Sequence, residues 1–238
     1  MRLSRLVLIG LILSAFVVQS QTQDSYTYSK EFIWGVNKNS SSGLIGGLVF
    51  KRSREVKENV FETYGLEIMN VRHPDEVRKS NGSGNFFLYG KSNYLFAFRT
   101  QYGRDFILFH KAPQQGVEIK AVFAAGPSIG LVAPYFINIG QDGSIKEQYN
   151  PKNPNHSFDK IAGSAGMLYG IGDSKFAFGG NIKAALNFET GVVKSQVGGF
   201  EIGVLIDAYT KKIIMVPTAT NKAVYPTIFL TIFYGSRR

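Results

Sequence analysis

The sequence predicts an all-β protein, an eight-stranded antiparallel up-and-down transmembrane β-barrel. Three observations predict this fold. Apolar and polar residues alternate along several segments, short and long connections alternate between those segments, and no run after the first twenty residues suits a transmembrane helix. Together these features are typical of the barrels that cross outer membranes.

The first twenty residues have the pattern of a secretory signal peptide. Arg2 and Arg5 precede a short apolar core from Leu6 to Val18, and Ser20 ends a stretch with small residues at the cleavage positions. This core is shorter than the roughly 20 residues that span a bilayer, although a retained N-terminal anchor is the alternative. We expect a signal peptide over 1–20 and an outer-membrane β-barrel over 21–238. A lipid-anchored lipoprotein is excluded because no cysteine follows the core.

The composition suits many strands joined by turns. The chain has 26 glycines, 13% aromatic residues and no cysteine, so no disulfide stabilises the fold. Its formal net charge is +10, and cleavage of the signal peptide would remove two arginines. Export argues against nucleic acid as the acidic partner. We therefore expect a basic surface to meet outer-membrane lipid and the phosphates of lipopolysaccharide.

Period-two alternation is clearest in two segments. Over 175–189 the even positions, from Phe176 to Phe188, are apolar or glycine, whereas the odd positions carry every charge and amide. Over 197–209 Phe200 and the next three even positions alternate with a set that contains Glu201 and Asp207. Helical spacing would mix these two sets on one surface, so both segments are predicted strands.

The content of the two faces predicts which one points outward. A soluble sandwich would cover its apolar face with a second sheet, whereas a membrane barrel turns that face to lipid. Here the polar faces mix small residues with charges of both signs, as a narrow lumen requires, and the apolar faces carry bulky Phe, Ile and Leu. This favours the membrane barrel. Eight strands are expected, over 31–37, 43–52, 59–71, 93–109, 117–137, 175–189, 197–210 and 224–235.

The connections fall into two kinds that alternate along the chain. Those over 53–58, 110–116 and 190–196 are short, and those over 72–92, 138–174 and 211–223 are long and polar, with 38–42 the one short member of the second set. Short periplasmic turns and longer external loops give this pattern in an outer-membrane barrel. An even number of strands places both chain ends in the periplasm. A soluble lipocalin-like barrel could alternate in the same way.

The last strand, Tyr225 to Tyr234, is β-branched and aromatic and resembles the C-terminal signal by which outer-membrane barrels are recognised for assembly. The match is partial because Gly235 and three further residues follow. More widely, the chain resembles the small outer-membrane β-barrel proteins of gliding and anaerobic Gram-negative bacteria. The residues that carry this resemblance are 34–38, 42–48, 101–105, 111–116 and 125–128. It implies a location in the cell outer membrane and a barrel fold, and it implies no reaction.

Residues with catalytic or metal-binding chemistry are sparse. His73, His110 and His156 lack the spacing of zinc ligands to one another or to Asp and Glu, so no metal or cofactor is expected. Lipid A-modifying outer-membrane enzymes need His or Ser beside an acid near the outer rim, which His73 with Asp75 or Glu76 would mimic in part. The glycine-rich stretch 163–172 lacks the Gly-Lys-Ser/Thr of a phosphate loop. The protein is therefore predicted not to be an enzyme.

The alternation places a set of charged residues of both signs on the inward face of the barrel. Two interpretations follow: a salt-bridged plug that fills the lumen, which we favour, or a selectivity path for a small solute. An eight-stranded barrel has an interior just wide enough to be filled by side chains, and unpaired charges there are costly. The expected lumen charge network is Glu67, Arg99, Asp105, Glu118, Lys120, Lys183, Glu189, Glu201 and Asp207.

These observations predict a non-enzymatic barrel with a structural or binding role. An accessory subunit of an envelope secretion or assembly complex is one form of that role, with other envelope proteins as partners. A lipid A-modifying enzyme and a narrow channel for small solutes remain the alternatives. The predicted external loops hold twelve Lys and Arg against six Asp and Glu, counting Lys91 and Lys175 at strand edges. This excess fits lipopolysaccharide phosphates and a simple solvated surface equally well.

Overall fold

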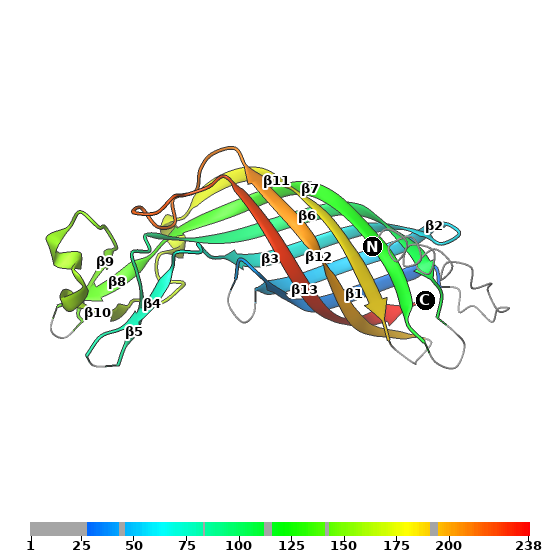
Figure 1. Ribbon diagram of the computed structural model, residues 1–238, viewed down its shortest axis with the longest axis horizontal. Helices are drawn as coiled ribbons and strands as arrows, with labels where there is room; N and C mark the ends of the chain where they lie inside the picture. Colours follow the sequence, from blue (N-terminus) through cyan, green and yellow to red (C-terminus); the bar gives the residue numbers. More distant parts are fainter. Residues whose placement is uncertain (1–27, 43–45, 83, 112–115, 141–142, 191–194) are drawn as a thin grey trace, which may run out of the picture.

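The computed structural model describes residues 28–238, apart from 43–45, 83, 112–115, 141–142 and 191–194 (Figure 1). The predicted signal peptide over 1–20 lies outside the described residues. No helix among the described residues is long and apolar enough to cross a membrane.

Eight long strands close into one antiparallel barrel, as the alternation predicted (Figure 1). Each strand pairs with its neighbours in the chain, and the first strand pairs with the last, with Trp34 opposite Tyr234. This seam leaves the barrel without an exposed edge. The strands are β1 (Lys30–Asn39), β2 (Gly47–Lys57), β3 (Val60–Val71), β6 (Asn93–Phe109), β7 (Glu118–Pro134), β11 (Lys175–Glu189), β12 (Gln196–Tyr209) and β13 (Val224–Arg237).

Burial alternates along these strands, most regularly in β1 and β13. In β13 every second side chain is buried and the others are exposed from one end to the other. The buried set includes Thr227, Thr231 and Arg237, whereas the exposed set includes Ile228 and Ile232. Polar side chains therefore point into the barrel, together with some apolar ones such as Phe229 and Phe233, and the outward face is mainly apolar.

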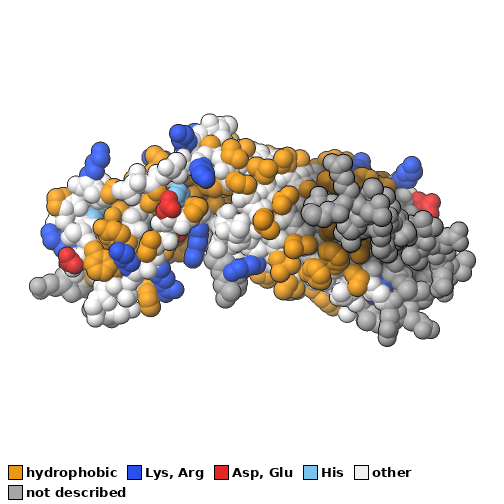
Figure 2. All heavy atoms as spheres, viewed as in Figure 1, with side chains coloured by type: hydrophobic (Ala, Val, Ile, Leu, Met, Phe, Trp, Pro, Cys, Tyr) orange, Lys and Arg blue, Asp and Glu red, His pale blue; other side chains and the backbone are white. Residues whose placement is uncertain are grey.

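The barrel exterior is an apolar belt (Figure 2). Ile232 and Phe178 remain 67% and 63% exposed on the isolated molecule, an exposure that a water-soluble wall would not sustain over so many neighbouring residues. Two edge-to-face aromatic pairs also lie on the outer surface, Trp34 with Tyr234 and Tyr64 with Tyr102. Trp and Tyr are enriched where a membrane meets water, so the barrel crosses a membrane.

A second structured region projects from the rim opposite the chain ends (Figure 1). A two-stranded hairpin, β4 (Val77–Ser80) and β5 (Phe86–Tyr89), arises between β3 and β6, and a three-stranded sheet, β8 (Phe136–Ile139), β9 (Ile145–Gln148) and β10 (Ile161–Ser164), arises between β7 and β11. Three short 3₁₀ turns accompany them, Pro154–His156, Phe158–Lys160 and Ile171–Asp173. We call this region the extension. Its core contains Phe87, Tyr135, Ile137 and Ile161.

The extension shows that two of the connections expected as long and polar contain strands of their own. The predicted single strand over 117–137 ends in the structure at Pro134, and the chain then enters β8 as part of a separate sheet. The second barrel strand is also longer than predicted toward its end, since β2 continues to Lys57. Long connections do alternate with short ones, but two of the long ones fold into strands of their own.

Candidate functional site

The inward face of the barrel carries the charged residues of the candidate site. All nine residues of the lumen charge network are buried. They come from strands β3, β6, β7, β11 and β12, and strict alternation turns them all to the same side of the wall. The structure divides them into two groups along the barrel.

The central group forms a continuous chain of ion pairs across the lumen. Arg99 joins Asp207 and Glu67, with nitrogen–oxygen distances of 2.5 and 3.1 Å. Lys183 joins the same Glu67 at 2.9 Å and Glu201 at 2.7 Å. Arg99–Asp207 and Lys183–Glu67 each join strands that are separated by two others in the sheet, so these two pairs cross the lumen, whereas Arg99–Glu67 and Lys183–Glu201 join adjacent strands.

Lys51 on β2 extends this chain and was not in the predicted set. Its ammonium group lies 2.6 Å from Asp105 and 3.5 Å from Glu201. Lys51 could not be recognised from the sequence because Arg52 follows it. Both residues are basic, so the alternation of polar and apolar residues does not show which of the two points inward. The predicted strand also ended at that point.

The second group lies near the barrel end that carries the chain termini. Lys120 contacts Glu189 closely and lies 3.3 Å from Glu31 and 3.5 Å from Glu118. Arg237 reaches the other oxygen of Glu189 at 3.0 Å.

Glu31 and Arg237 were not in the predicted network. Arg237 lay beyond the expected end of the last strand, and Glu31 began the shortest predicted strand. Their part in the lumen ion pairs is seen only in the structure, where Glu31 lies beside Lys120 and Arg237 lies beside Glu189.

Neutral polar side chains connect with the central group. Gln101 donates to Asn181, which donates to Ser128, and the Ser128 hydroxyl donates to Asp207, with distances from 3.0 to 3.1 Å. Among the described residues the two groups together hold seven carboxylates and five cations, each with an ion-pair partner. The lumen is therefore occupied by side chains that meet across it.

A cavity of about 490 Å³ lies at the foot of the extension, above the barrel mouth. The buried Lys91 ammonium lies 2.5 Å from Glu76 at its wall and 4.5 Å from the ring centre of Tyr94. Burial lowers the pKa of Lys91, and the Glu76 carboxylate opposes that shift. The second carboxylate oxygen of Glu76 is buried without a hydrogen-bond partner in the described part of the chain.

The histidines lie apart from one another and from the lumen. His73 lines this cavity, but both of its ring nitrogens are engaged, Nε2 with the Thr220 carbonyl at 3.2 Å and Nδ1 with the Asp75 amide at 3.1 Å. His156 is similarly fixed in the extension by the Asn150 amide. His110 follows the exposed end of β6. Within the described ranges no three His, Cys, Asp or Glu side chains gather closely enough to hold a metal ion.

A closed barrel with an apolar exterior and a charged, filled interior has the architecture of outer-membrane proteins. The protein is an outer-membrane β-barrel. No protein-family model matches the chain, and no curated protein matches it.

Solved structures similar to it are distant in sequence. Neisserial surface protein A (NspA) has a TM-score of 0.43 and 9% identity, with 89% of this chain and 97% of that chain covered. Ail, the attachment invasion locus protein of Yersinia pestis, has a TM-score of 0.38 and 10% identity, with 89% and 100% covered. Ail in complex with the heparin analogue sucrose octasulfate gives a TM-score of 0.38 and 9% identity, with the same shares covered. At these TM-scores the fold assignment rests on the closed strand order itself.

Proposed function

We propose that this protein is a closed, non-enzymatic barrel that holds its extension above the outer membrane, where it has a structural or binding role. The observation that carries the proposal is the chain of ion pairs from Asp207 through Arg99, Glu67 and Lys183 to Glu201. This chain leaves β12 at Asp207, crosses the interior to Arg99 on β6 and Glu67 on β3, and crosses back through Lys183 on β11 to Glu201 on β12.

Such a network opposes conduction for a physical reason. Each charge is nearly fully buried and already neutralised by a partner, and removing one partner of a buried pair costs about 3–5 kcal/mol. A permeating solute would have to displace these contacts in succession. The narrow interior of an eight-stranded barrel leaves little alternative route.

The arrangement around His73 favours a binding role over catalysis. A general base needs a free nitrogen within reach of the proton that it removes, and both nitrogens of His73 bond to the backbone. Its ring therefore fixes the segment around Asp75 to the loop around Thr220. The cavity beside it supplies unpaired acceptors, Glu76 Oε2 and Asn70 Oδ1, which suit a ligand that donates hydrogen bonds.

Four finer assignments belong to the same proposal. The protein is exported with a signal peptide over 1–20, and it is related to the small barrels of gliding and anaerobic Gram-negative bacteria. Basic residues of the extension, such as Arg78 and Lys79, meet the phosphates of lipopolysaccharide. Other envelope proteins bind the extension, with the barrel as an accessory subunit of a secretion or assembly complex.

Reconstitution tests the closed barrel directly. The purified full-length protein, inserted into planar bilayers, is expected to give no conductance steps, and proteoliposomes are expected to exclude small sugars. Stable conductance steps would overturn the closed barrel. Lipid A from cells that overproduce the protein is expected to keep its mass, and a deacylated or acylated product would identify an enzyme instead.

A further inference from the structure

A cluster of charged side chains interrupts the apolar exterior on β1, β2, β3 and β6. Arg52 and Arg54 on β2 are exposed and point outward, between Lys30 on β1 and Glu62 and Arg104 on β3 and β6. We call these five residues the wall cluster. It contains four cations and one carboxylate. Charge on the lipid face of a barrel is costly near the bilayer midplane and much less costly near the interfaces, so the depth of the wall cluster in the membrane matters.

The strand register places the wall cluster at a membrane interface. Arg52 pairs with Tyr64, which pairs with Tyr102. These two tyrosines form one of the outward aromatic pairs, and exposed tyrosines mark the headgroup level. Arg54 and its neighbours lie one step further toward the barrel end that carries the chain termini.

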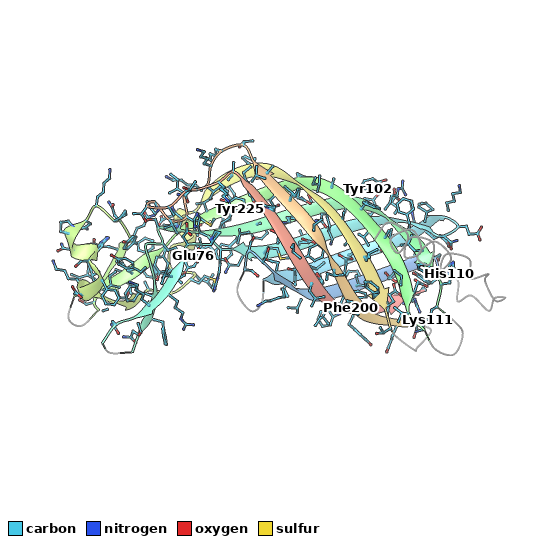
Figure 3. All side chains as sticks on the ribbon, in the orientation of Figure 1. Glu76, Tyr102, His110, Lys111, Phe200 and Tyr225 are labelled. Atoms are coloured by element: carbon cyan, nitrogen blue, oxygen red, sulfur yellow. The ribbon has the colours of Figure 1, made fainter. Side chains whose placement is uncertain are left out.

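That end faces the periplasm, because it also carries the tight turn between β2 and β3. Figure 3 shows Tyr102 in the same half of the barrel as Lys111, which follows β6 at that end. The lipid at this level is the inner, phospholipid leaflet of the membrane.

Glu62 holds two of the guanidinium groups in fixed positions. Its carboxylate accepts from Arg54 at 2.9 Å and from the Tyr102 hydroxyl at 2.8 Å, and it lies 3.6 Å from Arg104 Nη2. Arg104 Nη2 also donates to the Tyr102 hydroxyl at 3.0 Å. The arginines are therefore oriented by a built hydrogen-bond set, whereas solvated surface side chains would be free to move.

Unused donor capacity remains beside this set. Arg104 Nη1 is buried without a hydrogen-bond partner, and Arg52 forms no ion pair within the described residues. A surface hollow of about 300 Å³ opens beside Arg52, and it is lined by Lys30, Arg52, Arg54, Tyr64 and Ser53. Four cations around a single acid leave three positive charges unmatched. This surplus of positive charge lies at headgroup depth, where it can attract an anion.

We propose that the wall cluster binds the phosphate of an anionic phospholipid in the periplasmic leaflet. The guanidinium fork of Arg52 matches phosphate oxygens in a bidentate way. Lys30 and Arg54 neutralise the remaining charge, and Tyr64 packs against the glycerol and the first part of the acyl chain. The site rests on the membrane placement of the barrel and is independent of whether the lumen conducts.

Native mass spectrometry of the full-length protein in neutral detergent tests the site, with phosphatidylglycerol and zwitterionic phosphatidylcholine as probes. We expect one phosphatidylglycerol to remain bound, at least 10-fold more tightly than phosphatidylcholine, and millimolar inorganic phosphate not to displace it. Arg52→Gln with Arg54→Gln should lose at least 10-fold in phosphatidylglycerol affinity. The matched control, Lys211→Gln with Lys212→Gln, removes the same charge from the opposite end and should bind normally.

Several outcomes would overturn the proposal. Equal retention of both lipids, or equal loss in the control, would mean that only diffuse charge attraction acts. Displacement by inorganic phosphate would indicate a free anion as the ligand. Unchanged lipid binding combined with loss of a co-purifying protein would make the wall cluster a protein interface. The heat-dependent shift in gel mobility checks that each variant is folded.

Discussion

Arg99 on β6 and Asp207 on β12 meet across the barrel interior, where Arg99 Nε lies 3.0 Å from both carboxylate oxygens and Nη2 lies 2.5 Å from one of them. Strands β7 and β11 separate β6 from β12 in the wall. This pair therefore ties two non-adjacent strands together through the lumen. The same is true of Lys183 and Glu67, and the stability of the barrel should depend on such bridges.

Lys183→Met tests the plug. Its removal leaves Glu67 and Glu201 without the ammonium group that lies 2.9 and 2.7 Å away, and such a loss costs about 3–5 kcal/mol. The temperature at which the barrel loses its heat-dependent gel shift should fall clearly. Lys175→Met, at an exposed position of the same strand, is the matched control and should melt normally. Unchanged melting of Lys183→Met together with altered ion conductance would instead indicate a hydrated channel, where water and salt screen the acids.

Ile182→Arg tests the lipid face. Ile182 is 58% exposed on the outer surface, between Ala125 and Ile206 in the register. An arginine there should cost roughly 2–4 kcal/mol if the residue lies near the bilayer midplane. Folding yield into lipid vesicles and melting should both decrease, whereas Ile182→Leu should behave like the parent protein. Equal tolerance of both substitutions would contradict a lipid-facing position.

Cysteine labelling tests the orientation of the barrel in the outer membrane. The chain has no native cysteine, so only the introduced residue can react. Asn155 lies in the extension and Glu58 lies in the tight turn between β2 and β3. Asn155→Cys should react with an impermeant thiol reagent on intact cells. Glu58→Cys should react only after the outer membrane is opened, and the reverse pattern would place the extension in the periplasm.

Glu76→Gln tests how the extension is held on the barrel. The carboxylate lies 2.5 Å from the buried Lys91 ammonium and accepts from the His73 amide at 3.0 Å. Without it, burial should lower the pKa of Lys91 further, because no carboxylate would then stabilise the ammonium form. Protease cleavage within the extension should increase on intact cells while barrel melting stays constant. Asp75→Asn, next to it but mostly exposed, should have little effect.

The sequence was most informative where one face differs sharply from the other. The predicted strand over 175–189 coincides with β11, because lipid selects Phe176 and Ile182 on one side while the lumen selects Lys183 and Glu189 on the other. The prediction stopped short in β2, where Lys51 and Arg52 are both charged although one points inward and the other outward. The outward charge of the wall cluster at Arg52 is thus the reason that Lys51 was not predicted as part of the lumen network.

The strands of the extension could not be predicted from the alternation of polar and apolar residues, for a different reason. Val77–Ser80 and Ile145–Gln148 are four-residue strands without alternation, and their stability comes from backbone pairing with partners that the barrel rim brings near. Lys91 and Glu76 likewise meet only because β5 returns to the rim. Which distant charges form ion pairs depends on the register between strands, and this register cannot be read from a single sequence.

The seam between β1 and β13 has a consequence for biogenesis. Until Tyr234 can lie opposite Trp34, the sheet has two open edges, and each is a template for pairing with another chain. Closure also joins the most distant parts of the sequence, so it is entropically the slowest contact to form. The barrel therefore cannot close before the last strand, β13, has been synthesised. A chain that stops before β13 keeps an open sheet edge. We expect such a chain to depend on chaperones and to be degraded, whereas a chain that includes β13 can close the barrel.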